Sequence, residues 1–199
     1  YYAPYKPDGY NLNTLRTHPD LLHNVSPLQW GLKEIFEYAE VLLNRDDVDA
    51  KADAVLALIN EKLIRTNDPD YNLGVKVTNF NRLNEWFERL INEMQDENKK
   101  EWKSHHIATL YKVRNRLMNI TTRCRGLVGN GDVVSDLPWG EFHKNHIYVV
   151  DVANLDPTAQ DLVFTRIVSK IRESLEQDSL GVERVVIFVD ELNKYAASD

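Results

Sequence analysis

The sequence predicts an α/β protein in which part of a β-sheet core is joined to a largely α-helical insertion. Before Gly126, apolar residues recur at three- and four-residue spacing, which is typical of helices. After Gly140, two β-rich runs flank a helical stretch. A strand, a helix and a second strand in this order form the right-handed parallel crossover unit, so the second half indicates part of a parallel sheet.

The first part of the chain, 1–126, is expected to be a mostly helical insertion that follows an early core strand. Its apolar stripes and its few β-branched runs indicate four helices. The first helix is predicted to begin at Pro27, with Ser26 as its N-cap, and the second to run from Asp47 to Arg65. The third is predicted to start after a cap formed by Asn79 or Asn81, and the fourth to span His106 to Arg125.

The second part, 127–199, is expected to be a partial α/β core. Its glycines, Pro138 and the sequence Gly129-Asn130-Gly131-Asp132 predict a loop before the core begins. The core itself is predicted to consist of a strand at 146–153, a helix at 157–177 and a strand at 184–190.

Composition limits the classes of protein. The 199 residues are 43% hydrophobic and 28% charged, which is enough to bury a substantial core. No apolar run approaches the roughly 20 residues that cross a bilayer, and no basic leader is visible, so we expect a cytoplasmic protein without membrane contact. The single cysteine, Cys124, excludes an internal disulfide and a usual four-ligand zinc site.

The net charge of −7 argues against a broad nucleic-acid surface. Basic residues do gather between Lys112 and Arg125, so any nucleic-acid contact must be local. Because they alternate with apolar residues at helical spacing, the pattern favours the solvated face of an amphipathic helix.

The last predicted strand ends in two adjacent carboxylates, Asp190 and Glu191, after the apolar run Val185 to Val189. A strand that is apolar on both faces is typical of a buried parallel sheet, and open α/β sheets bind ligands at the carboxyl ends of their strands. In phosphate-cleaving enzymes, such acids hold magnesium and orient the attacking water. The alternative is an ordinary core strand that ends in a polar turn.

Two segments resemble a known family. They are Ile147-Tyr148-Val149-Val150-Asp151-Val152-Ala153-Asn154-Leu155 and Phe188-Val189-Asp190-Glu191-Leu192-Asn193-Lys194-Tyr195-Ala196, with weaker agreement at Tyr2-Ala3-Pro4-Tyr5 and Pro27-Leu28-Gln29-Trp30-Gly31-Leu32. The chain thereby resembles HerA-type ATPases of the FtsK-like branch of P-loop NTPases. The resemblance implies a RecA-like parallel sheet, ATP and Mg²⁺ as cofactors, a hexameric ring of identical subunits, and DNA translocation.

The resemblance also implies roles for single residues. Asp190 would be the acidic-strand (Walker B) aspartate that holds magnesium through water, and Glu191 would polarise the attacking water. Asn193 and Lys194 would sense the terminal phosphate or contact a neighbouring subunit, the alternative being simple loop residues. Asp151 ends a neighbouring strand and would lie at the same sheet edge, although its position also fits an aspartate that caps a turn.

The main departure from the family is the absence of a Gly-x-x-x-x-Gly-Lys-[Ser/Thr] phosphate loop within the 199 residues. We therefore expect the chain to be a piece of a longer ATPase that is inactive alone, the alternative being a pseudo-ATPase. Arg123 and Arg125 are candidates for a cation that acts on a neighbouring subunit's nucleotide. The alternative function is a non-catalytic helical module that docks a partner nuclease or effector.

Other chemistry finds little support in the sequence. His105 and His106 are adjacent and would point apart on a helix, while His143 and His146 have no nearby carboxylate or cysteine pattern. Cationic neighbours of Cys124 could lower the pKa of its thiol, but a structural thiol is the favoured interpretation.

Overall fold

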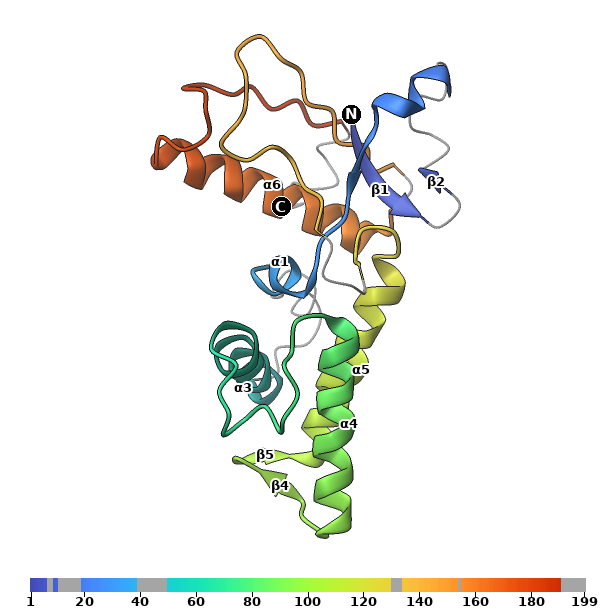
Figure 1. Cartoon of the computed structure of the whole chain (residues 1–199), viewed down its shortest axis with the longest axis vertical. Coiled ribbons are helices and arrows are strands. Elements are labelled where there is room, and N and C mark those ends of the chain that lie inside the picture. Colours follow the sequence, from blue (N-terminus) through green and yellow to red (C-terminus); the bar gives the residue numbers. More distant parts are fainter. Residues whose placement is uncertain (7–8, 11–18, 39–49, 130–133, 154, 191–199) are drawn as a thin grey trace, which may run out of the picture.

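A computed structural model of the chain describes residues 1–6, 9–10, 19–38, 50–129, 134–153 and 155–190. Figure 1 shows an elongated molecule with helices α3, α4 and α5 at one end and a small sheet, helix α6 and long loops at the other. One hydrophobic cluster of buried side chains runs through both ends, from Leu28 to Leu180. The helical region and the sheet region are therefore packed on a shared core.

The sheet is small and mixed. Strand β1 (Tyr2–Lys6) pairs in parallel with β3 (Ser26–Leu28) and antiparallel with the short β2 (Gly9–Tyr10). An isolated parallel bridge joins Tyr2 to Val150, with backbone hydrogen bonds from Tyr2 N to Val149 O and from Asp151 N to Tyr2 O. The structure thus confirms a mixture of helix and strand with a small parallel component.

The parallel pairing corrects the expected first helix. Ser26 and Pro27 lie in β3 and not at a helix start, because Ser26 N donates to Tyr1 O and the strand pairs with β1. The N–H that donates to the neighbouring segment belongs to Ser26 and not to Pro27, which has none, while the carbonyl of Pro27 accepts a hydrogen bond from Ser135 Oγ. The helix begins later, as α1 (Leu32–Phe36).

The two strands predicted in the second half do not form as predicted. Of the segment 146–153, only Val150 makes a bridge, and 184–189 is assigned no strand. Both segments are rich in β-branched apolar residues, but a strand also requires a hydrogen-bonded neighbour along its length. Within the described part of the chain, no backbone hydrogen bond supplies such a ladder to 184–189.

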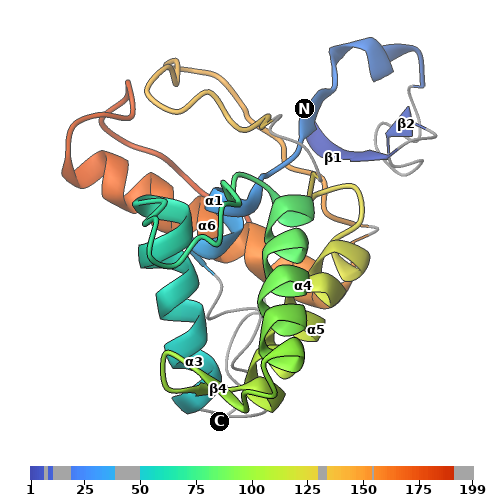
Figure 2. The same cartoon turned by 60° about the horizontal axis from the view of Figure 1, so that its bottom comes forward.

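The helical end is built from α3 (Ala50–Leu58), which continues into the π-helical turn η2 (Ile59–Arg65), together with α4 (Phe80–Asp96) and α5 (Ile107–Arg123). Figure 2 shows α4 and α5 side by side, with α3 beside them. The hairpin of β4 (Glu101–Trp102) and β5 (His105–His106) joins α4 to α5. The described helices confirm the predicted Asp47–Arg65 and His106–Arg125 segments to within a few residues, 47–49 lying outside the described residues.

Helix starts at this end follow capping chemistry. Asn79 caps α4, because its side-chain oxygen accepts a hydrogen bond of 2.9 Å from Arg82 N, so Asn79 and not Asn81 is the cap. His106 caps α5 by accepting from Ala108 N.

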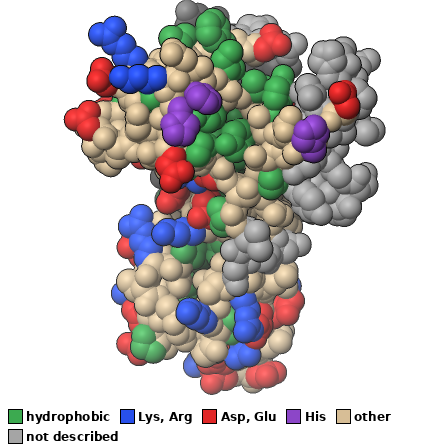
Figure 3. Space-filling model, turned by 45° about the horizontal axis from the view of Figure 1, so that its top comes forward, with side chains coloured by type: hydrophobic (Ala, Val, Ile, Leu, Met, Phe, Trp, Pro, Cys, Tyr) green, Lys and Arg blue, Asp and Glu red, His purple; other side chains and the backbone are tan. Residues whose placement is uncertain are grey.

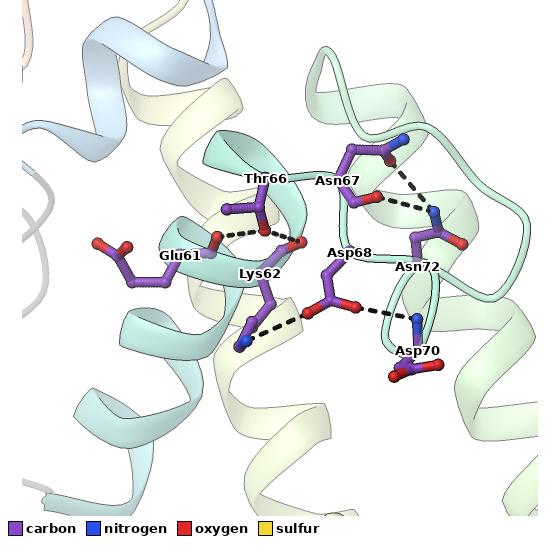
Figure 4. A network of polar contacts seen from close by, with 7 residues as sticks. All are labelled: Glu61, Lys62, Thr66, Asn67, Asp68, Asp70 and Asn72. Carbon is purple, nitrogen blue, oxygen red and sulfur yellow. Dashed lines mark hydrogen bonds and ion pairs between the residues drawn. The ribbon is translucent and has the colours of Figure 1, made fainter.

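A polar turn ends η2 and directs the chain toward α4 (Figure 4). Lys62 Nζ donates to Asp68 Oδ2 at 3.1 Å, and Asp68 Oδ1 accepts from Asp70 N. Asn72 Nδ2 donates to both oxygens of Asn67, and Asn67 has a positive φ of 46°. These contacts satisfy the polar groups of the turn locally, so we interpret the turn as structural.

Helix α6 (Pro157–Glu176) follows the Val149–Asp151 segment. Asp156 caps it by accepting from Thr158 N, and proline stands at the first helical position. The predicted helix at 157–177 is confirmed to within one residue.

The short 3₁₀ helix η1 (Pro19–Asn24) precedes β3. Among the described helices, none is long and apolar enough to cross a bilayer.

Candidate functional site

The carboxyl edge of the parallel strands is the expected position of a ligand site. Strand β3 leads through Trp30 and Gly31 into α1, and the Val149–Asp151 segment leads into α6. Both segments run parallel to β1, so their carboxyl ends open on the same edge of the sheet. In open α/β folds, this edge is where ligands bind.

Asp151 stands at this edge and closes a turn. Its Oδ1 accepts a hydrogen bond of 3.0 Å from Ala153 N. The contact is the one expected for an aspartate that caps a turn. One carboxylate oxygen of Asp151 is therefore already engaged with the backbone of its own turn, and a ligand at this edge would bind next to it.

Asp190 is the last residue of the described segment that follows α6. It is exposed, whereas the preceding Val189 is half-buried. Asp190 forms no ion pair with another described residue, and its carboxylate is accessible to a cation. Glu191, Asn193 and Lys194 lie outside the described residues, so the structure does not place the rest of the predicted site.

Arg123 and Arg125 flank Cys124 at the end of α5. Both arginines are exposed, while Cys124 is completely buried. Burial raises the pKa of the Cys124 thiol to about 12, with Asp156 adding to the rise and Arg123 opposing it. Desolvation thus outweighs the neighbouring cations, and Cys124 is a structural thiol rather than a nucleophile.

A buried charged cluster, which the sequence analysis missed, connects α6 to α1 and to the loop before Trp139. Arg166 is 1% exposed, and its Nη2 donates to Asp136 Oδ2 at 2.6 Å, while its Nη1 donates to Glu37 Oε2 at 3.3 Å. Its guanidinium also lies 4.8 Å from the ring centroid of Trp30. This cluster fixes three segments of the chain to one side chain.

The signal for Arg166 is visible in the sequence in retrospect. Arg166 lies four residues after Leu162 and three after Val163, so it shares their buried helix face. A charged residue on such a face needs a partner, and Asp136 supplies it from 30 residues away. Sequence spacing within one helix cannot identify a partner on a distant loop.

The surroundings of Arg166 are poorly solvated. The pKa of Lys170 is lowered, first by burial and then by the charge of Arg166. Burial likewise raises the pKa of Tyr38. Arg166 Nε and Trp30 Nε1 are buried donors without a hydrogen-bond partner in the described part of the chain. The cluster is thus a densely packed structural contact whose ion pairs lie in a region of low polarity.

The fit of the implied magnesium ion can be tested on the described side chains. Among them, no group of three or more His, Cys, Asp and Glu could hold a metal ion alone. The rings of His143 and His146 lie 5.3 Å apart but both residues are exposed. Magnesium commonly takes only one or two carboxylates and completes its shell with water and phosphate oxygens. The exposed carboxylate of Asp190 fits that kind of binding.

Comparison of the chain with protein families, with curated proteins and with solved structures finds no match.

Proposed function

We propose that the chain is part of an ATP-hydrolysing DNA motor of the HerA-like class, with a RecA-like core. The observation that carries the proposal is the apolar run Val185 to Val189 followed directly by Asp190 and Glu191 and by the string Leu192-Asn193-Lys194-Tyr195-Ala196. The parallel pairing of β1 with β3 and with Val150 supports the α/β part of the proposal.

In this proposal, Asp190 would hold the magnesium ion of ATP through water, and Glu191 would polarise the water that attacks the terminal phosphate. The accessible carboxylate of Asp190 supports its role. A phosphate loop elsewhere in the full-length polypeptide would hold the phosphates, and Asn193 and Lys194 would sense the terminal phosphate or contact a neighbouring subunit. Bound magnesium neutralises the charge that develops during phosphoryl transfer.

A hexameric ring of identical subunits is the assembly in which this chemistry would drive DNA movement. Arg123 and Arg125 are exposed at the end of α5, which supports a role on a neighbouring subunit's nucleotide. Such a cation from outside the subunit stabilises charge in related phosphoryl-transfer enzymes.

A second function is a helical module that docks a partner nuclease or effector. Charge distribution favours it: residues 50–125 contain 14 Lys or Arg and 10 Asp or Glu, a net charge of +4, whereas the whole chain carries −7. A positively charged helical end on an acidic protein suits an acidic partner surface, because complementary charge speeds association.

ATP turnover by the full-length polypeptide tests the first function. Glu191→Gln should abolish magnesium-dependent turnover and leave nucleotide binding unchanged, because an amide cannot polarise water as a carboxylate does. Glu183→Gln is the matched control, since Glu183 is exposed in the same segment. Unchanged ATP turnover in the Glu191→Gln variant would contradict the proposed motor function. If the full-length sequence contains no phosphate loop, the helical docking module becomes the favoured function.

A further inference from the structure

Two histidine side chains meet on the turn that precedes the Val149–Asp151 segment. His143 and His146 are both exposed, and their ring centroids lie 5.3 Å apart. Lys144 and Asn145 form the turn between them, and Asn145 has a φ of 63°, a left-handed conformation that asparagine tolerates. In Figure 3, histidine side chains (purple) lie at the surface of the end of the molecule that carries the sheet and α6.

Tyr148 fixes both histidines. Its hydroxyl oxygen accepts a hydrogen bond of 3.1 Å from His143 N, and its ring stacks on that of His146 with centroids 6.3 Å apart. The same ring lies 4.4 Å from the ring of Phe142, which is buried in the core. One half-buried side chain therefore connects the two exposed histidines to the interior of the protein.

The base of the turn is anchored to the segment after α6. Phe142 N donates a hydrogen bond of 3.1 Å to Leu180 O. Gly181 has a φ of 93°, and a Cβ atom at this position would lie only 2.9 Å from the carbonyl oxygen of Phe142. This close approach of two backbones holds the turn in place, so the histidine pair stands on a fixed base.

The hydrogen bonding of His146 leaves one ring nitrogen ready to bind a cation. Nδ1 of His146 lies 3.1 Å from the carbonyl oxygen of Lys144. Because a carbonyl only accepts, Nδ1 carries the hydrogen, and Nε2 of the neutral ring keeps its lone pair. Metal-binding histidines commonly donate their other ring nitrogen to a backbone carbonyl in this way. His143 uses its backbone N–H in its contact with Tyr148, which leaves its exposed ring accessible.

The separation of the two rings fits one shared metal ion. An imidazole bound at the usual zinc–nitrogen distance of about 2.0–2.1 Å has its ring centre about 3 Å from the ion, so two rings at a tetrahedral angle have centres about 5 Å apart. The separation of 5.3 Å between His143 and His146 agrees with this value. Exposed side chains change their torsions rapidly, so small rotations can direct both rings at one ion.

We propose that His143 and His146 bind one divalent transition-metal cation of the kind that prefers imidazole, with Zn²⁺ as the representative ion. Among the described residues, no group of three or more His, Cys, Asp and Glu could hold a metal ion, so this site has two protein ligands. Its other coordination positions are open to water or to a donor from another molecule. The pair precedes the Val149–Asp151 segment, whereas Asp151 ends it, so the site is separate from the edge proposed for ATP and does not depend on ATP hydrolysis.

Isothermal titration calorimetry of the full-length polypeptide with Zn²⁺ tests the site, in an excess of Mg²⁺ that occupies oxygen-rich sites. The wild type should show one binding event that His143→Gln and His146→Gln each weaken by about tenfold or more, since each loses one ligand. His23→Gln is the matched control, because His23 is exposed and its Nδ1 also contacts a backbone carbonyl, that of Asp20 at 2.7 Å. It should bind zinc as the wild type does. Cys124 does not compete, since it is buried and the pKa of its thiol is raised to about 12.

A second variant separates the geometry of the pair from its composition. Asn145→His/His146→Gln keeps two histidines on the turn and the same formal charge but changes their spacing. It should bind zinc as weakly as His146→Gln, because the stacking on Tyr148 and the hydrogen bond to the Lys144 carbonyl belong to position 146. Circular dichroism of each variant checks that helix content is unchanged.

Three results would overturn the proposal. The first is a zinc affinity in His143→Gln and His146→Gln equal to that of the wild type. The second is a loss of zinc binding in His23→Gln as large as in His146→Gln, which would mean that isolated surface histidines bind the ion. The third is wild-type affinity in Asn145→His/His146→Gln, since the observed arrangement of the two rings would then be irrelevant.

Discussion

The guanidinium of Arg166 and the carboxylate of Asp136 form a buried ion pair with an N–O distance of 2.6 Å. Their side chains are 1% and 12% exposed, so neither charge is well solvated. Glu37 adds a longer contact to the same guanidinium from a side chain that is 43% exposed. The pair connects α6 to a loop 30 residues away in the sequence, so its loss should lower the free energy of unfolding of the protein.

Removing one member of the pair should destabilise the protein strongly. We expect Asp136→Ala to lower the free energy of unfolding by about 3–5 kcal/mol, because it leaves a buried guanidinium without its main partner. Glu37→Ala should cost less than about 1 kcal/mol, since its carboxylate is partly solvated. Urea unfolding monitored by tryptophan fluorescence measures both. Equal losses in the two variants would contradict this ranking.

The cap of α4 offers a second test with a neighbouring control. Asn79→Ala should lower the free energy of unfolding by about 1 kcal/mol, because Arg82 N loses its acceptor. Asn81→Ala should change it by less than about 0.5 kcal/mol, since Asn81 lies exposed inside the helix. The same urea titrations serve here. A larger loss in Asn81→Ala would mean that the cap is misassigned.

Acidification should weaken the helical end through His105. Burial lowers the pKa of His105 in the folded protein, so the unfolded chain binds the proton more readily. Stability is therefore complete above the ordinary histidine pKa of about 6.5 and falls as the pH drops from there toward the lower folded pKa.

The variant His105→Gln should show a smaller fall in stability over this pH range than the wild type. Chemical unfolding at pH values on both sides of the range measures the difference. His143→Gln is the control, because His143 is exposed, and it should keep the wild-type pH dependence. Parallel curves for the wild type and His105→Gln would show that another group is responsible.

Cys124 should resist modification while the protein is folded. Its raised pKa of about 12 leaves almost no thiolate at pH 8, and its burial blocks access. A thiol reagent that reports by absorbance should react only after addition of denaturant. Rapid reaction of the native protein would place the thiol at the surface.

Local patterns in the sequence predicted the helices better than the sheet. The positions of α4, α5 and α6 follow from apolar spacing and from caps such as Asn79 and Asp156, which act within a few residues. Ser26 and Pro27 were misread because pairing with β1 overrides a helix-start pattern. Strand formation at 184–190 depends on a neighbour that apolar composition alone cannot supply.

The candidate site shows the same division. Asp190 was found from its place after an apolar run, a purely local signal, and Asp151 from its place at the end of a β-rich segment. The Arg166–Asp136 pair was missed because its partners lie on separate segments that only the folded chain brings together.

The magnesium dependence of ATP binding by the full-length polypeptide measures whether Asp190 holds the metal ion. We expect Asp190→Asn to raise the magnesium concentration needed for half-maximal ATP binding several-fold and to leave metal-free nucleotide binding unchanged. Asp178→Asn, at an exposed position after α6, should behave as the wild type. An identical magnesium dependence in Asp190→Asn and the wild type would contradict the proposed role of Asp190.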